Sequence, residues 1–384
     1  MKHYMLFEAK LLLKDRKNSL LIILFGIFLV GIVFFINLQG VGNLEKQIYH
    51  DLQNNTIAIE RFNELERENP ETQPSYKNVL SQQRAIARQD VNLRFEDNTK
   101  FLQASITLAN LRIQGHELGY KGVPSSFFVN KIQAEKDLLY YTYLLEKNIP
   151  IVTDDLNGAN YLSVTLVFLG PFIFFVLLLL SSDILTADLS HSSLVMSFPL
   201  IYKQRVWSKL VIHVCFNFLM ICLLLFTVTG IVSAFFGSGI FASPFIFYLD
   251  GSYTVISIWQ QALLSIVYVL VLCVHIVLLC TLLNSIFKNM YLSIFAAGIL
   301  YVLPNLFSSF FKLVYWLPMN YYNYSPILNG TVAERFQQPQ FDYSSALWIL
   351  TAWSGIILFL LSNEMKYRKR QSHTDYQIPK GDKA

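Results

Sequence analysis

Long apolar stretches, separated by short polar connections, dominate the chain from residue 161 to residue 362, and one more lies near the N-terminus. A helix needs about 20 predominantly apolar residues to cross a bilayer, and each stretch meets or approaches that length. A soluble core could not absorb so many stretches of this kind. We therefore predict six transmembrane helices at Leu20–Leu38, Tyr161–Leu180, Leu210–Phe236, Ile256–Leu283, Tyr291–Phe311 and Ser345–Leu361.

The first apolar stretch follows a basic segment, as the core of a signal peptide would. It is longer than the roughly 7–15 residues of a signal core, and no small-x-small cleavage site follows it. We interpret it as a retained span, transmembrane helix 1, over residues 19–39. Pro304 falls inside the fifth predicted span and can break it.

Lysine and arginine are unevenly shared between the two sides of these spans. The loop from Gly237 to Ser257 contains no lysine or arginine, and the segment Lys312–Tyr343 contains two such residues. By the positive-inside rule, both termini are cytoplasmic. We predict a multi-pass protein of the plasma membrane with a cytoplasmic basic tail at 363–384. The basic residues on the predicted inner side are Lys2, Lys10, Lys14, Arg16, Lys17, Lys203, Arg205, Lys209, Lys288, Lys366, Arg368, Lys369 and Arg370.

Residues 1–18 combine apolar and basic positions at helical spacing. Tyr4, Phe7 and Leu11 recur on one face, while lysines occupy another. This pattern predicts a cytoplasmic amphipathic helix lying in the membrane interface. A basic flank that only orients the first span explains the same residues equally well.

Residues 40–160 form a polar insert that the topology makes extracellular. Apolar positions predict helices from Leu44 to near Asn69-Pro70, from Tyr76 to about Gln114, and from Phe127 to about Lys147. Together these form a helical domain between transmembrane helices 1 and 2. The fold class is therefore all-α integral membrane, with residues 161–362 carrying transmembrane helices 2–6.

Composition argues against several other classes. Hydrophobic residues make up 54%, charged residues 15%, and mean hydropathy is +0.42. A net charge of +4 gives no reason to expect nucleic acid. The four cysteines lie in apolar spans and are interpreted as packing residues. His116 lacks the second histidine of a zinc motif, because position 120 is tyrosine. We expect no catalytic, cofactor or metal site on this chain.

The cytoplasmic loop 182–209 carries the most informative motif. Acidic residues follow the second span, small and apolar residues come next, and basic residues follow Phe198-Pro199. Proline cannot continue a helix interior and disfavours helix at the preceding residue. The loop should therefore hold a short helix that can insert into a groove on a partner protein. Its candidate coupling residues are Asp183, Asp188, Ser192, Ser193, Leu194, Phe198, Pro199, Tyr202, Arg205 and Lys209.

With these residues in view, the chain resembles the ABC-2 type permeases of ABC transporters. The likeness covers the interfacial helix, the number of spans, the loop around Pro199, and the segment from Tyr140 to Pro150, which resembles Gram-positive members. A Gly-Thr pair common in the family is Ser192-Ser193 here. The aromatic and proline-rich stretch Lys312–Tyr343 also resembles the family and suggests a re-entrant or interfacial hairpin.

The resemblance implies a homodimer of permease chains whose loops dock on a dimer of ABC ATPase subunits. The chain has no Gly-x-x-x-x-Gly-Lys-[Ser/Thr] motif of its own; the stretch from Gly115 to Gly122 fails because Gly122 follows Lys121. ATP and Mg are therefore expected on the partner subunit. Membrane lipid is the other expected partner.

Polar residues inside spans can mark a transport pathway. His213 and Asn217 lie one turn apart in the third span, and His275 lies in the fourth. Hydrogen bonding between helices is the simpler interpretation of all three. No Asp or Glu lies deep in a span, which weakens a proton-driven transporter.

Two functions from different classes remain open. The first is the permease subunit of an ATP-driven exporter of a peptide, lipid-like or drug-like substrate. The second is a membrane sensor or scaffold whose extracellular domain binds a ligand and signals to a cytoplasmic partner. A membrane-embedded enzyme is a weaker third, since no catalytic constellation is evident.

Overall fold

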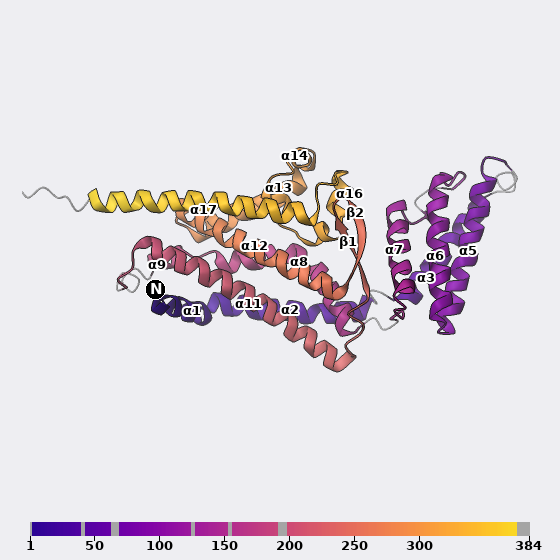
Figure 1. Cartoon of the computed structure of the whole chain (residues 1–384), viewed down its shortest axis with the longest axis horizontal. Coiled ribbons are helices and arrows are strands. Elements are labelled where there is room, and N and C mark those ends of the chain that lie inside the picture. Colours follow the sequence, from indigo (N-terminus) through magenta and orange to yellow (C-terminus); the bar gives the residue numbers. More distant parts are fainter. Residues whose placement is uncertain are drawn as a thin grey trace, which may run out of the picture.

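A computed structural model describes residues 2–39, 43–62, 69–123, 127–152, 156–190 and 198–374, with side chains described up to Met365 except at 189 and 190. The chain folds into two parts along its longest axis (Figure 1). One is a long helix bundle, here called the membrane body. The other is a smaller helical domain at one end of it. The opposite end, where α1 lies, is here called the α1 end.

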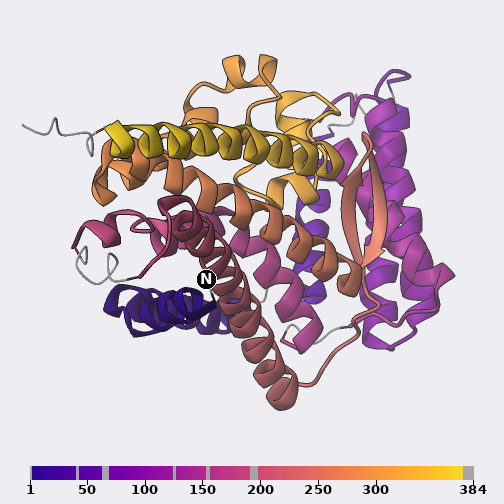
Figure 2. The same cartoon turned by 60° about the vertical axis from the view of Figure 1, so that its left-hand side comes forward.

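The membrane body is built mainly from long helices packed side by side, which Figure 2 shows from a second direction. They are α2 (Arg16–Gln39), α8 (Gly158–Ser181), α11 (Tyr202–Phe236), α12 (Ile258–Phe287) and α17 (Tyr343–Thr374). Helices α8, α12 and α17 run in one direction, and α2 and α11 run in the other. Within the described residues, five helices are long and apolar enough to cross a membrane: Arg16–Gln39, Gly158–Asp188, Tyr202–Phe236, Ile258–Phe287 and Tyr343–Met365. The protein is therefore a predominantly helical membrane protein.

The predicted fifth span is shorter than expected. Helix α13 runs from Met290 to Leu306 and stops two residues after Pro304, and a short helix, α14 (Ser308–Leu313), follows. Pro304 lies inside α13, and the helix ends where the Phe307 backbone leaves the helical region, with φ −117° and ψ 50°. A break close to Pro304 is therefore present, and α13 ends before the predicted Phe311.

Short helices then lead the chain back into the bundle. They are η2 (Pro318–Tyr321), α15 (Ser325–Leu328) and α16 (Thr331–Phe336). Tyr322 and Tyr324 are buried among α8 and α12, and the Tyr324 hydroxyl donates to the carbonyl of Leu166 in α8. Irregular backbone is tolerated deep in a membrane protein only where protein surrounds it. We call residues 318–328 the re-entrant segment, because they fold back among α8 and α12; their depth in the membrane stays a prediction.

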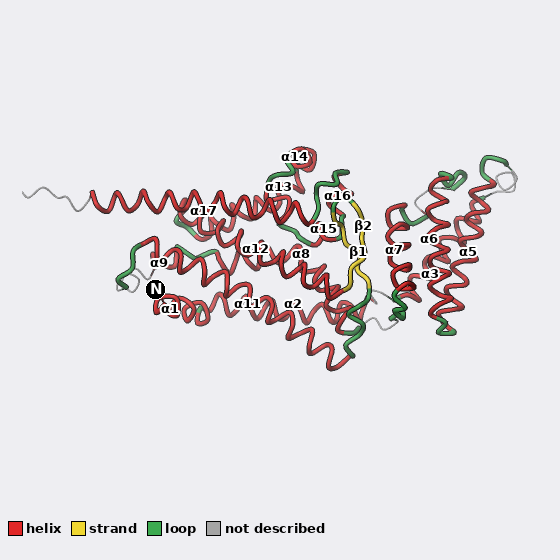
Figure 3. The backbone as a smooth tube through the Cα atoms, viewed as in Figure 1, coloured by secondary structure: helices red, strands yellow, loops and turns green. Residues whose placement is uncertain are grey.

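Two strands interrupt the all-α expectation. Strands β1 (Pro244–Leu249) and β2 (Ser252–Ser257) pair antiparallel, with Leu249 opposite Ser252. Asp250 and Gly251 both have positive φ, as a tight two-residue turn requires. Figure 3 shows the hairpin in yellow between the membrane body and the helical domain. Ile256, which was predicted to begin the fourth span, lies in β2. Helix α12 begins at Ile258, and Ser257 caps it by accepting a hydrogen bond from the Gln260 amide.

The helical domain contains α3 (Leu44–Arg61), α5 (Gln73–Arg94), α6 (Asn98–Glu117) and α7 (Lys131–Glu146). The single helix predicted from Tyr76 to Gln114 is thus two helices. Glu96 has a left-handed backbone and Asp97 caps α6 by accepting from the Lys100 amide, which together end one helix and start the next. Helix α3 also ends at Arg61, earlier than predicted.

Two apolar clusters hold this domain together. One surrounds Ile86, Phe101 and Leu102, and partly buried Ile240 of the membrane body packs against it. The other surrounds Phe62 and Tyr120. Because Ile240 packs against this cluster, apolar contact as well as the chain connections joins the helical domain to the membrane body.

Candidate functional site

Helix α1 (Lys2–Lys14) lies along the α1 end of the membrane body and buries Tyr4, Glu8 and Leu12. These positions are four residues apart and share one helix face. An acid on a buried face needs a partner, because an unpaired buried charge is costly. Burial and the neighbouring Glu8 carboxylate raise the pKa of Tyr4 well above its ordinary value, so the phenol stays neutral.

Lys209 of α11 supplies the partner to Glu8. Its ammonium lies 3.0 Å from Oε1 of Glu8 and 2.8 Å from Oδ1 of Asp188 in α9 (Thr186–Ser190). The Lys209 and Glu8 side chains are each 4% exposed, whereas that of Asp188 is 23% exposed. We call this the Glu8–Lys209–Asp188 triad. It joins three elements that are far apart in the sequence.

A second ion pair lies beside the triad. The Lys17 ammonium is 2.6 Å from Oδ1 of Asp183 and 3.3 Å from the Ser182 hydroxyl, so α2 is tied to the end of α8. Asn284 of α12 donates to the Ser182 carbonyl at 2.9 Å. The turn that leaves α8 is therefore held from two sides.

An aromatic contact secures the later part of the loop. The Phe198 ring lies 5.2 Å from that of Tyr4 and 5.1 Å from that of Phe7, centroid to centroid. Such spacing is within the favourable range for aromatic pairs. Pro199, one residue on, is exposed. The loop thus presents its proline outward while its phenylalanine is anchored on α1.

The last part of the predicted loop 182–209 is helical. Residues 202–209 form the first turns of α11, where the Arg205 guanidinium lies 6.0 Å from the Tyr202 ring centre. Ser192, Ser193 and Leu194 lie outside the described residues. The predicted coupling helix can be followed only as α9, from Thr186 to Ser190.

A cavity of about 510 Å³ opens between α1, the α8–α9 turn and α11. We call it the α1 pocket. Four predicted site residues, Asp183, Asp188, Lys209 and His213, line it together. Sequence reasoning missed Glu8, which also lines it; the available signal was an acid four residues from both Tyr4 and Leu12. Its remaining lining residues include Phe7, Leu11, Leu12, Lys14, Asp15, Ile184, Thr186, Ala187 and Met290.

The other polar residues predicted within spans lie away from this pocket. Asn217 is fully buried and donates to the Ser181 hydroxyl at 2.8 Å. The two ring nitrogens of His275 lie 3.0 Å from the Ser354 hydroxyl and 3.2 Å from the Tyr322 hydroxyl. His275 therefore links α12, α17 and the re-entrant segment through internal hydrogen bonds.

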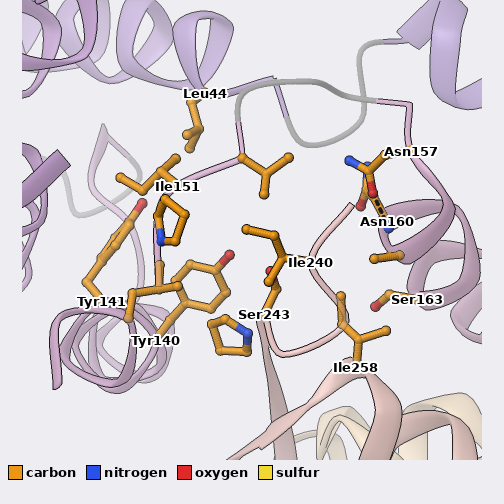
Figure 4. A pocket seen from close by; sticks show the side chains of 15 residues that line it. Leu44, Tyr140, Tyr141, Ile151, Asn157, Asn160, Ser163, Ile240, Ser243 and Ile258 are labelled. Atoms are coloured by element: carbon orange, nitrogen blue, oxygen red, sulfur yellow. Dashed lines mark hydrogen bonds between the residues drawn. The ribbon is translucent and has the colours of Figure 1, made fainter. Parts of the chain in front are cut away.

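A smaller cavity, about 160 Å³, lies where the helical domain meets the membrane body. Figure 4 looks into it, with Tyr140 and Tyr141 from α7 toward one wall and Asn157 and Ser163 toward the other. Burial raises the pKa of Tyr140. Among the described residues, its lining carries no charged side chain, which suits a small neutral group.

An ion pair closes the same junction from the side. The Lys136 ammonium of α7 lies 2.7 Å from Oε1 of Glu334 in α16 and 4.4 Å from the centre of the Tyr253 ring in β2. The Tyr253 hydroxyl donates to the same carboxylate. We call these three residues the Lys136–Glu334–Tyr253 latch. It joins the helical domain to both the hairpin and the segment before α17.

The latch predicts a pH dependence. Burial would raise the pKa of Glu334, but hydrogen bonds from Lys136 and Tyr253 outweigh it and lower the pKa below its ordinary 4.5. A lowered folded-state pKa stabilises the attachment above pH 4.5, and this contribution is lost as the pH falls through the lowered value. We expect hydrogen exchange in α7 to be slower in the wild type than in Glu334→Gln above pH 4.5, and the difference to vanish in stronger acid.

Burial raises the pKa of Asp137, so its effect on stability changes with pH in the opposite direction. Comparing the variant with the wild type at each pH separates the contribution of Glu334 from that of Asp137. Lys131→Met is the matched control, since Lys131 is exposed on the same helix and, among the described residues, its ion pair is with Glu135 at 4.0 Å. Equal α7 exchange in the wild type and Glu334→Gln at neutral pH would contradict the latch.

Among the described residues, no group of three or more His, Cys, Asp or Glu side chains could hold a metal ion. His116 instead places Nε2 2.7 Å from the Val129 carbonyl. Comparison with protein family models, with curated proteins and with solved structures finds no match to this chain.

Proposed function

We propose that the chain is the permease subunit of an ATP-driven exporter of the ABC transporter class, with ATP bound and hydrolysed by separate subunits. In this proposal two permease chains form a dimer in the plasma membrane, α13 is the sixth crossing, both termini are cytoplasmic and the helical domain is extracellular. The substrate is a peptide, a lipid-like molecule or a drug-like molecule. Lysines and arginines gathered near α1, α9 and the start of α11 support this orientation.

The observation that carries the proposal is the Glu8–Lys209–Asp188 triad. A loop that receives force from an ATPase needs a stiff connection to the transmembrane helices. Asp188 is in the loop, Lys209 is in α11, and Glu8 is in α1. A push on α9 would therefore be transmitted directly to a membrane-crossing helix and to the helix that lies beside it.

The exposed Pro199 beside anchored Phe198 supports a docking role for the same loop. A partner could bind the proline side without displacing the phenylalanine from α1. Short helices and turns of this kind bind partners by inserting into a groove.

The test is purification of the full chain with its bound proteins, followed by assays of ATP turnover and transport. We expect an ABC ATPase to co-purify. Pro199→Ala, at an exposed position, and Asp188→Asn should each reduce the coupling between transport and ATP turnover by at least about fivefold, the lower end of typical coupling energies. Asp90→Asn, in an exposed pair with Arg94, is the matched control.

Purification without any ATPase would overturn the proposal. So would unchanged transport and ATP turnover in both Pro199→Ala and Asp188→Asn. The latch and the neutral cavity at the domain junction favour a second candidate in that event, a membrane sensor whose helical domain binds a ligand. A sensor would show ligand binding by the helical domain and a cytoplasmic partner that is not an ATPase.

A further inference from the structure

Among the described residues, the α1 pocket has one more carboxylate on its wall than there are ammonium groups beside it, counting Lys17. Four carboxylates line it, from Glu8, Asp15, Asp183 and Asp188, against the ammoniums of Lys14 and Lys209. Lys209 is shared by two of the carboxylates, and Lys17, from outside the lining, pairs with Asp183. Lys14 is exposed. An entering anion would therefore face carboxylates, whereas a cation would complete their pairing.

A buried nitrogen on the same wall also lacks a partner. His213 is 3% exposed, lines the α1 pocket, and its Nδ1 has no hydrogen-bond partner among the described residues. Buried polar atoms are normally satisfied, so an exception that faces a cavity needs an explanation. Nδ1 of a neutral imidazole accepts a hydrogen bond when the ring proton is on Nε2, and an ammonium group has three hydrogens to donate.

The remaining wall is apolar. Phe7, Leu11 and Leu12 of α1 face the cavity with Ile184 and Met290. At about 510 Å³ the cavity falls within the range of roughly 300–1,000 Å³ that small-molecule sites occupy. An acidic patch, a free acceptor and an apolar wall together match a molecule with an ammonium head and a hydrocarbon tail.

We propose that the α1 pocket binds an amphipathic primary amine, with its ammonium at the acidic wall and His213 and its tail against α1. This goes beyond the exporter proposal and does not depend on it, because no ATPase takes part. The amine has two possible sources with the same chemistry: an aminolipid headgroup from the membrane, or a soluble amphipathic amine. Bound there, it would rest against Lys209 and Asp188, where the loop joins α11.

The test uses the purified full chain in phosphatidylcholine nanodiscs and a dodecylamine that carries a photoreactive diazirine. We expect saturable labelling of peptides from α1 and from residues 183–190, and at least about tenfold weaker labelling by the matching diazirine alcohol, which lacks the charge. His213→Phe removes the acceptor but keeps a ring, and should weaken labelling by the amine about tenfold.

Met290→Trp fills the pocket without touching a charged group, and it should abolish labelling even if His213→Phe folds poorly. Leu292→Trp is its matched control, because Leu292 is half exposed on the same helix and does not line the pocket. Equal labelling by amine and alcohol, or unchanged labelling in Met290→Trp, would overturn the proposal.

Nanodiscs that also contain phosphatidylethanolamine separate the two sources. Competition by this lipid against the probe identifies an aminolipid as the ligand. Labelling that resists the lipid but yields to free dodecylamine identifies a soluble amine. Either result supports the amine site, and neither bears on whether an ATPase binds the chain.

Discussion

Lys209→Met will destabilise the protein by about 3–5 kcal/mol, the usual cost of removing one partner from a buried ion pair. Methionine keeps most of the side-chain volume, so the loss comes from charge. Glu8 would be left as a buried carboxylate, since its side chain is only 4% exposed. Asp188 is 23% exposed and can be hydrated in part. The free energy of unfolding, measured by SDS titration in mixed micelles, reports the change.

The matched control is Lys203→Met, an exposed lysine in the first turn of the same helix. It should change the unfolding free energy by no more than about 0.5 kcal/mol. Adding Glu8→Gln to Lys209→Met should restore much of the loss, because the uncompensated charge is then gone. A Lys209→Met variant as stable as Lys203→Met, or no restoration by Glu8→Gln, would contradict the triad.

Tyr324→Ala will have the second large effect, a loss of about 3–5 kcal/mol, the range for deleting a large buried aromatic side chain. The Tyr324 ring is 1% exposed and lies 5.8 Å from that of Tyr268 in α12. Its hydroxyl also donates to the Leu166 carbonyl in α8, near Pro171, which is inside that helix. Truncation would leave a cavity and remove one hydrogen bond where the re-entrant segment meets α8.

Tyr324→Phe separates these contributions, because it keeps the ring and should cost only about 1 kcal/mol. Tyr291→Ala is the matched control, since the Tyr291 side chain on α13 is 75% exposed. SDS titration gives the free energies, and hydrogen exchange should quicken across residues 318–328 in Tyr324→Ala alone. Equal losses in Tyr324→Ala and Tyr291→Ala would show that the re-entrant segment is not held by this contact.

The membrane-crossing helices were predictable because the length of an apolar run is a direct physical requirement of the bilayer. Arg16–Gln39 and Tyr202–Phe236 contain the runs predicted for them. Helix boundaries depend instead on local signals, such as turn residues and capping side chains, which an apolar run does not reveal. Asp250-Gly251 is a strong hairpin signal, yet the segment was treated as a plain connection. Asp97 likewise has the chemistry of a helix cap.

The candidate site was predictable only in part. Asp183, Asp188 and Lys209 were singled out, and they line one pocket with His213. Glu8 was missed because a glutamate in a basic amphipathic helix is normally placed on its polar face. Its burial depends on Lys209, which the chain brings close only after folding. Pairings across such a distance in sequence leave no periodic signal in either segment.

The hairpin has a mechanical consequence. Strand β2 ends at Ser257 and α12 begins at Ile258, with no connecting loop to absorb motion. Tyr253 of β2 belongs to the latch, while Asn284 at the far end of α12 reaches the turn that carries Ser182. The hairpin and α12 therefore form one continuous connection between the latch and the turn after α8. If a ligand at one end shifts α12, thermodynamic reciprocity requires that a second ligand bound at the other end change the affinity for the first by the same factor.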